Sequence, residues 1–231
     1  MLCNHSEHSH LTQTDGGPVL KSTATVLPAE GLRARKKKET HQRICDAATA
    51  LFIQQGYTET TCDAIALQAN ISKPTFFNYF PSKLAVLHTL IDEMDRQFLL
   101  YINDEIRQPD TTARRLQSLL ARSARYINRS PALTRLILVE GMGALGNVDK
   151  SQARFSRLHE AMASLLNAGV EQGDVRTDYS IELLVQMLVG GYLYALLNWL
   201  SSQQVDLTVR LAETAGFLAE SLAPPTAQPP R

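Results

Sequence analysis

The sequence predicts an all-α protein that consists of a small N-terminal domain and a larger C-terminal helical domain. Apolar residues recur at the three- and four-residue spacing of an α-helix in successive segments between residues 38 and 222. Gly, Pro, Asn and Asp separate these segments. No run of alternating β-branched residues indicates a strand. A chain of 231 residues is long enough for one or two domains with their own cores.

Both ends of the chain are predicted to be disordered tails. Residues 1–32 lack periodicity and are rich in Ser, Thr, His, Gly and Pro, and residues 223–231 contain four prolines. The His-rich stretch 3–10 offers ligands for transition metals, but a tail without a fold does not fix their geometry. We therefore predict no metal site and no cofactor.

The first helix is predicted over about Lys38 to Gln55, and Gly56 ends it. One apolar stripe runs along it: Ile44, Ala47, Ala48, Leu51 and Phe52. A compact basic run lies directly before this helix and consists of Arg33, Arg35, Lys36, Lys37 and Lys38. Such a run is either a solvated linker or a contact to phosphate and to an adjacent minor groove.

Residues 61–83, TCDAIALQANISKPTFFNYFPSK, predict two short helices joined by a tight turn and followed by the capped start of a third. Thr61 can cap the first of these helices and Ser72 the second. Asn70 lies where the chain must reverse, and Asn tolerates the left-handed conformation. Pro74 falls in a first helical turn, where a missing N–H costs little. The pattern indicates a helix-turn-helix, whose second helix can enter the major groove of DNA, although an ordinary helical hairpin has the same spacing.

The second of these helices divides into an inner and an outer side. Phe76 and Phe80 lie four residues apart and are predicted to pack inward. The exposed N-terminal end is left with Ser72, Lys73, Pro74 and Thr75. Ser82 can cap the following helix, and a helix N-terminus with Lys83 beside it is suited to a phosphate.

The distribution of charge agrees with a nucleic-acid interface. Residues 31–90 carry eight Lys/Arg against four Asp/Glu, whereas residues 1–30 and 91–231 each have a balance of −2. One basic segment on an otherwise slightly acidic protein is typical of a DNA-binding module.

Residues 41–87 carry a long series of features in a specific order: Ile44, Ala47, Ala48, Leu51, Phe52, Gly56, Tyr57, Thr60, Thr61, Ile65, Ala66, Ala69, Ser72, Thr75, Phe80 and Lys83. In these features the stretch resembles the N-terminal DNA-binding domain of the TetR family of transcriptional regulators. The resemblance implies a helix-turn-helix DNA-binding domain over residues 33–90. It also implies a helical effector-binding and dimerisation domain over residues 91–222.

The resemblance further implies which residues touch double-stranded DNA: Thr61, Ser72, Lys73, Pro74, Thr75, Phe77, Asn78, Tyr79 and Lys83. Lys73, Pro74 and Thr75 are the expected readers of base edges. The expected phosphate contacts are Thr61, Ser72, Tyr79 and Lys83. The chain departs from the family at Phe77, where a tyrosine is common, and at Asn70, where glycine is usual; the latter costs about 1 kcal/mol at most.

A long helix is predicted to begin near Lys83 and to link the two domains. The last two predicted helices, over about Ser180 to Leu200 and Asp206 to Leu222, differ from the others. The first of them is apolar almost all round and must be buried on more than one side. It is either half of an intermolecular four-helix bundle or a central core helix of a monomer. The resemblance favours a homodimer formed through about residues 180–222.

We therefore predict a dimeric TetR-like regulator, in the first place a repressor released from a near-palindromic operator by a small-molecule effector. The alternatives are a transcriptional activator with the same DNA-binding domain, and a helical ligand-binding protein or enzyme whose hairpin is only structural. No Ser/His/Asp set and no metal-ligand constellation supports an enzyme. The pocket remains unassigned, because its candidate residues suit a plain core equally well: Tyr126, Met142, Phe155, Met162, Tyr192, Tyr194 and Trp199.

The sequence also predicts a soluble, cytoplasmic protein. Three cysteines are too few for a disulfide framework. No stretch is expected to reach the roughly 20 apolar residues of a membrane span. The N-terminus lacks the basic-then-apolar order of a signal peptide.

Overall fold

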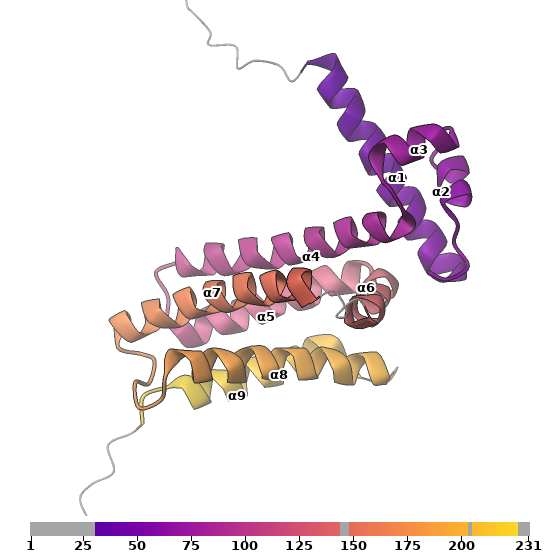
Figure 1. Cartoon of the computed structure of the whole chain (residues 1–231). Coiled ribbons are helices and arrows are strands. Elements are labelled where there is room, and N and C mark those ends of the chain that lie inside the picture. Colours follow the sequence, from indigo (N-terminus) through magenta and orange to yellow (C-terminus); the bar gives the residue numbers. More distant parts are fainter. Residues whose placement is uncertain (1–30, 144–147, 203–204, 226–231) are drawn as a thin grey trace, which may run out of the picture.

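The computed structural model describes residues 31–143, 148–202 and 205–225, and within these ranges it contains helices and no strand. The helices are α1 (Leu32–Gln55), α2 (Cys62–Gln68), α3 (Lys73–Tyr79), α4 (Lys83–Ile106), α5 (Thr112–Arg129), α6 (Pro131–Gly143), α7 (Val148–Gln172), α8 (Ile181–Ser201) and α9 (Leu207–Leu222) (Figure 1). The predicted all-α fold is confirmed. Of the predicted tails, residues 1–30 and 226–231 lie outside the described ranges.

The N-terminal domain consists of α1, α2, α3 and the first turns of α4 around one apolar core. All five residues of the stripe predicted on α1 are buried in it. Ile65 of α2, Phe76 of α3 and Leu87 of α4 meet this stripe, each with at most 1% of its surface exposed. Because α3 inserts a fully buried aromatic ring, its angle to the other helices is fixed.

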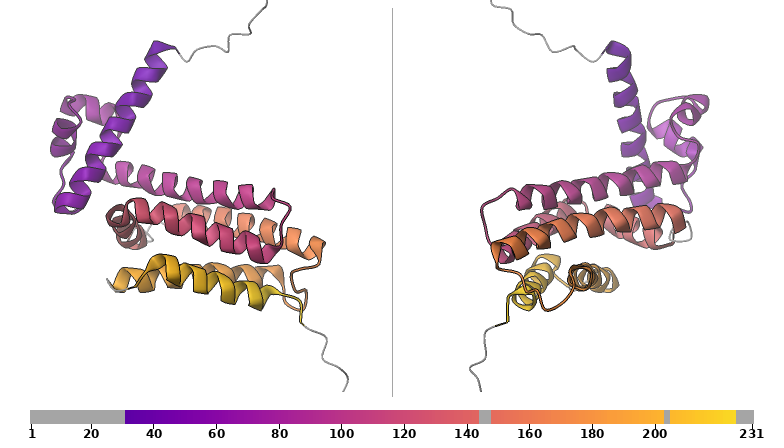
Figure 2. Two further views of the ribbon diagram at one scale, coloured as in Figure 1. Left: turned by 180° about the vertical axis from the view of Figure 1, so that it is seen from behind. Right: turned by 60° about the vertical axis from the view of Figure 1, so that its left-hand side comes forward.

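Helix α1 begins at Leu32, six residues before the predicted start. The basic run therefore lies on the helix and is not a linker before it. Arg and Lys are good helix formers, and Arg35 pairs with Glu39 one turn later at 3.4 Å, which favours continued helix. Residues 32–39 are all exposed. In both views of Figure 2 these turns project beyond α2 and α3, on the side away from the C-terminal helices.

Helix α4 starts at Lys83 as predicted, with the Ser82 side chain accepting a hydrogen bond from the Ala85 N–H at 3.2 Å. Val86, Leu87 and Ile91 belong to the N-terminal core. Further along, Ile102 is buried in the core of the C-terminal domain. One continuous helix therefore joins the two cores.

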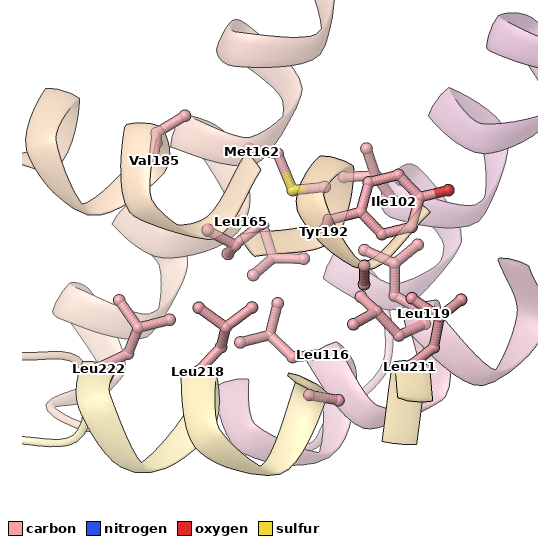
Figure 3. Packing of buried hydrophobic residues seen from close by; sticks show 14 of the residues in the cluster. Ile102, Leu116, Leu119, Met162, Leu165, Val185, Tyr192, Leu211, Leu218 and Leu222 are labelled. Atoms are coloured by element: carbon pink, nitrogen blue, oxygen red, sulfur yellow. The ribbon is translucent and has the colours of Figure 1, made fainter. Parts of the chain in front are cut away.

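The C-terminal domain packs α5 to α9 and the second half of α4 around a larger core (Figure 3). Leu116 and Leu119 of α5, Leu165 of α7 and Leu211 of α9 are fully buried there. At one end of the domain, Thr112 binds Asp174 through its N–H at 2.6 Å and its hydroxyl at 2.8 Å. This approach requires Gly169, since a Cβ at that position would collide with the side chains of Thr112, Asp174 and Val175.

Helix α6 begins at Pro131. Proline is favoured in a first helical turn, because it lacks a backbone N–H and an N–H at that position would have no partner within the helix. The core of the N-terminal domain includes Ile137 of this helix, with Leu133 and Leu136 packed against it. Helix α6 therefore touches both domains.

Helix α8 corrects one prediction, because it is long and apolar enough, by length and composition, to cross a membrane. In the fold it packs between α7 and α9, and 39% of its most apolar window is buried within the single chain. Its apolar character is explained by burial on one side and by the exposed stripe described below.

Candidate nucleic-acid interface and internal cavity

The turn between α2 and α3 has the predicted local geometry. The Thr61 hydroxyl accepts from the Ala64 N–H at 3.1 Å, and the Ser72 hydroxyl accepts from the Thr75 N–H at 3.3 Å. Asn70 has a φ of 52° and is the non-glycine residue with positive φ in the described chain. These caps satisfy helix N–H groups that otherwise lack partners. The local chemistry of residues 61–75 therefore builds the helix-turn-helix directly.

The outer side of α3 is open to solvent. Ser72, Lys73, Pro74, Phe77 and Asn78 are exposed, and Thr75 and Tyr79 are half-buried. Phe76 and Phe80 point into the core, with 0% and 3% exposure. The structure thus brings the expected base-reading residues together on one surface, and Thr61 at the start of α2 is exposed as well. Their contacts to DNA stay a prediction.

Lys73 is held by an exposed ion pair. Its ammonium group lies 2.9 Å from the carboxylate of Asp63 on α2, and both side chains are about 60% exposed. An exposed pair of this kind contributes roughly 0–1 kcal/mol. Lys73 can therefore exchange Asp63 for a group on DNA at little cost in free energy. The Thr75 hydroxyl shares a 2.7 Å hydrogen bond with Ser72, which leaves the Thr75 methyl group for an apolar contact.

Lys83 makes contacts that the sequence did not indicate. Its Nζ donates to the backbone carbonyls of Tyr57, Thr58 and Thr60 at 2.7, 2.9 and 2.9 Å, and it lies 4.6 Å from the centre of the Tyr57 ring. Three carbonyls use all three donors of an ammonium group. Lys83 therefore fastens the α1–α2 connection to the start of α4. Its expected phosphate contact remains a prediction, with these carbonyls as competitors.

The cysteines of the N-terminal domain are free thiols. Burial raises the pKa of the Cys45 thiol to about 11, so it stays protonated and unreactive at neutral pH. Cys62 is half-buried at the first position of α2. In the described part of the chain no cluster of His, Cys, Asp or Glu could hold a metal ion.

A cavity of about 290 Å³ lies between α4, α5, α6, α7 and α8 and is partly open to solvent, since its wall includes the exposed residues Phe155, Arg157 and Leu197. Three of the seven candidate pocket residues line it, namely Tyr126, Phe155 and Tyr192. Met162 and Trp199 belong to the core, and Tyr194 is 71% exposed. The side chain of Met142 lies outside the described residues. Helix α4 contributes a wall of the cavity that the sequence did not indicate, and this wall consists of Met94, Asp95, Phe98, Leu99 and Tyr101.

The wall of the cavity is largely apolar, and polar side chains of the wall contact one another at two places. Ser123 and Tyr192 share a buried hydrogen bond of 2.7 Å, and the Tyr192 ring stacks on Phe98 at 5.0 Å. Burial raises the pKa of Tyr192 to about 12. At the second place, Asp95 of α4 forms an ion pair with Arg154 of α7. An apolar space with few placed polar groups is typical of a small-molecule site.

Comparison with known proteins agrees with this geometry. Residues 44–90 match the family of bacterial regulatory proteins named tetR. An uncharacterized HTH-type transcriptional regulator of Bacillus subtilis, YdeS, is 29% identical over 172 residues, which are 71% of this chain and 82% of YdeS. The HTH-type transcriptional repressor KstR of Mycolicibacterium smegmatis is 27% identical over 206 residues, covering 82% and 95% of the two chains.

Solved structures share the fold. The TetR-family repressor FadR of Thermus thermophilus, solved in complex with lauroyl-CoA, has a TM-score of 0.59 and 29% identity, and the match covers 83% of this chain and 99% of FadR. SmeT, the repressor of a Stenotrophomonas maltophilia multidrug efflux pump, has a TM-score of 0.68 at 19% identity, over 80% and 92% of the chains.

The helix-turn-helix and these relatives define a DNA-binding transcriptional regulator and not an enzyme. Residues 44–90 carry the DNA-binding domain of the tetR family, and the chain as a whole is similar in sequence and fold to TetR-family regulators.

Proposed function

We propose that this protein is a dimeric repressor that leaves its operator when a small apolar molecule occupies the internal cavity. The observation that carries the proposal is the course of α4. Its first turns belong to the core of the N-terminal domain, and Met94 and Phe98, one and two turns after Ile91, line the cavity. A ligand in the cavity therefore acts on the helix that positions α3.

The DNA contacts are assigned to the outer side of α3 and its neighbours. Lys73 donates to guanine, the Thr75 methyl contacts thymine, and Pro74 lies beside them at the groove. Thr61, Ser72 and Tyr79 face phosphates, and Phe77 and Asn78 complete the surface. Lys83 binds a phosphate only in exchange for one of its carbonyl partners. Exposure of the outer side of α3 and the weak Lys73–Asp63 pair support this assignment. The basic turns of α1 add phosphate contacts with little sequence preference.

The dimer is assigned to α8 and α9. Leu183, Met187, Tyr194 and Leu197 are exposed on one face of α8, at intervals that match helical turns, and Phe217 of α9 is 70% exposed. A Cβ added at Gly190 or Gly216 would meet no atom within 4 Å, so both glycines face open space. A large apolar stripe of this kind is typical of a protein–protein interface. Two copies joined here place two α3 helices on one DNA, as a near-palindromic operator requires.

Ligand binding changes DNA affinity only if the ligand prefers the arrangement that does not fit DNA. Helices α4 and α6 supply the physical link. Ile137 of α6 lines the cavity and is also buried in the N-terminal core, so both domains share one side chain. Expansion of the cavity displaces Ile137 and Met94 together. The effector is expected to be apolar, and the acyl chain of the lauroyl-CoA bound to Thermus FadR is a first candidate class.

The experiment is retardation of labelled genomic fragments from the region that flanks this gene, at low salt. We expect one fragment to bind the wild-type protein, and Lys73→Ala and Thr75→Ala to bind it at least about fivefold less well, since one good base contact is worth roughly 1–3 kcal/mol. Arg114→Ala, at an exposed position of α5, is the matched control and should bind as wild type does. Equal binding by all four proteins, or by none, contradicts the proposal.

A further inference from the structure

The wall of the cavity carries three charged side chains, Asp95 on α4 and Arg154 and Arg157 on α7. Arg154 donates from Nε and Nη2 to the two oxygens of Asp95, and the Nη2–Oδ1 distance is 2.8 Å. This fork-shaped pair joins helices whose paired residues are 59 positions apart in the sequence. It is the strong, geometrically specific form of a salt bridge.

The surroundings of the pair make it costly to open. The Asp95 side chain is 23% exposed and that of Arg154 is 33% exposed. By contrast, Glu93 and Arg96, a pair on the outer surface of α4, are 53% and 60% exposed. Attraction between charges grows as water is excluded, and so does the cost of leaving one charge without its partner. If Arg154 is withdrawn, the Asp95 carboxylate is left against an apolar wall.

The position of Asp95 on α4 connects this cost to DNA binding. Ile91, one turn earlier, is 4% exposed in the N-terminal core, and the intervening Met94 both packs on that core and lines the cavity. A shift of α4 that exposes the carboxylate to water removes the free-energy cost of an unpaired Asp95. Such a shift also moves the start of α4, which shares the N-terminal core with Phe76 of α3.

The chemistry of Arg154 indicates what can withdraw it. A guanidinium group binds carboxylate and phosphate groups with the same two-pronged geometry that it uses for aspartate. Arg157, one turn further along α7, also lines the cavity, and no described residue forms a hydrogen bond or ion pair with it. An anion that enters the cavity therefore finds one unengaged guanidinium group next to one held only by Asp95.

We propose that the cavity takes an amphiphile with an apolar body and one carboxylate or phosphate group, and that this group takes Arg154 from Asp95. The inference rests on the proposed function, to which it adds the ligand's head group and the switch that the ligand operates. The Asp95–Arg154 pair holds α4 in the DNA-binding arrangement. The apolar body lies along Phe98 and Leu158, and the anionic group lies at Arg154 and Arg157. Because coupling is reciprocal, bound DNA lowers the affinity of the protein for the ligand by the same factor by which the ligand lowers its affinity for DNA.

The first test compares head groups on a constant chain. Dodecanoate, dodecyl phosphate and the neutral dodecanol are titrated into the complex of full-length protein with its flanking DNA fragment, below the concentrations at which they aggregate. Release is followed by fluorescence anisotropy. We expect at least one of the two anions to release the DNA at a concentration about tenfold or more below that of dodecanol. The better of the two anions identifies the head group.

The second test removes the switch. Asp95→Asn and Arg154→Gln should bind the fragment about five- to tenfold more weakly than wild type without any amphiphile, within the usual range of coupling between sites. Arg154→Gln should also abolish the preference for the anion over dodecanol. Arg154→Lys, which keeps the charge but loses the fork, should recover part of both. Glu93→Gln and Arg96→Gln remove the exposed pair on the same helix and should behave as wild type. Thermal unfolding of each variant separates a loss of fold from a loss of coupling.

Three results overturn the inference while the proposed function stands. They are release by dodecanol as effective as release by either anion, binding of none of the three amphiphiles, and wild-type DNA affinity in Asp95→Asn and Arg154→Gln. If wild-type protein binds no flanking fragment, the proposed function fails instead.

Discussion

Lys83 shows how much one side chain can organise in a small domain. Its ammonium group holds three carbonyls of the segment between α1 and α2 and lies over the Tyr57 ring. The orientation of α2, and through it of the helix-turn-helix, depends on this contact.

We expect Lys83→Met to lower the free energy of unfolding by about 1–3 kcal/mol, because three carbonyls lose a charged donor. Urea denaturation measures the change. Lys36→Met, at an exposed position of α1, is the control and should leave stability unaltered. A stable Lys83→Met protein with weakened DNA binding would instead assign Lys83 to phosphate.

Phe77 is 45% exposed and makes an edge contact of 5.3 Å with Phe76. Phe77→Tyr adds a hydroxyl on the outer side of α3, where it can donate to a phosphate. We expect tighter binding to all DNA sequences alike, by up to about tenfold for one charge-assisted hydrogen bond. Competition between operator and random DNA measures this. A changed sequence preference would place Phe77 among the bases.

Tyr192 links stability to alkaline pH. Its pKa is raised to about 12 in the folded protein, above the value near 10 of an unfolded tyrosine. The neutral form is thus favoured by folding, and its contribution is complete below about pH 10 and lost as pH rises toward about 12. We expect the midpoint of thermal unfolding to fall as pH rises through this window. In Tyr192→Phe the midpoint should fall less steeply with pH. Identical slopes would show that burial of Tyr192 does not govern the decline.

At the scale of elements, α1 differs most from its prediction. The basic run forms exposed helical turns that project beyond α3, which gives the charges a rigid support. Each lysine that neutralises a phosphate releases counterions and steepens the dependence of affinity on salt.

Replacing Lys36, Lys37 and Lys38 together by Gln should lower the slope of log affinity against log salt by about 1–3, since each phosphate contact contributes roughly 0.9. The affinity of this variant for specific DNA and its affinity for random DNA should fall to a similar extent. The control replaces three exposed arginines of the C-terminal domain, Arg107, Arg114 and Arg210, by Gln. If both triple variants show the same slope, the turns of α1 do not touch DNA.

At the scale of the whole molecule, the exposed apolar stripe of α8 and α9 decides between a monomer and a dimer. We expect Tyr194→Arg combined with Phe217→Arg to shift the protein from dimer to monomer in analytical ultracentrifugation, because two buried charges would lack partners. DNA affinity should fall at least about a hundredfold, as one half-site is lost. Leu100→Arg, an exposed apolar position of α4 outside the stripe, is the control. If the double variant is still a dimer, the dimer interface lies elsewhere on the molecule.

The sequence by itself determined the features that depend on neighbours a few residues apart. The caps at Thr61, Ser72 and Ser82 and the positive φ of Asn70 follow from local hydrogen bonds and backbone sterics, and all four are present. The apolar stripe of α1 followed from helical periodicity, which marks the buried face without any knowledge of the fold. The predicted start of α1 lies six residues too late, because a run of charged residues suits a solvated linker as well as a helix, and Lys and Arg favour the helix.

Only the tertiary structure decided the contacts that give the molecule its proposed switch. Lys83 reaches carbonyls 23 to 26 residues away, and Asp95 meets Arg154 across 59 residues. The same packing sorted aromatic residues of similar pattern into cavity wall, core and surface, as Tyr192, Trp199 and Tyr194 of α8 show. Side-chain partners and cavities depend on how helices cross. Periodicity fixes which face of a helix is apolar, but leaves open which helix will cover it.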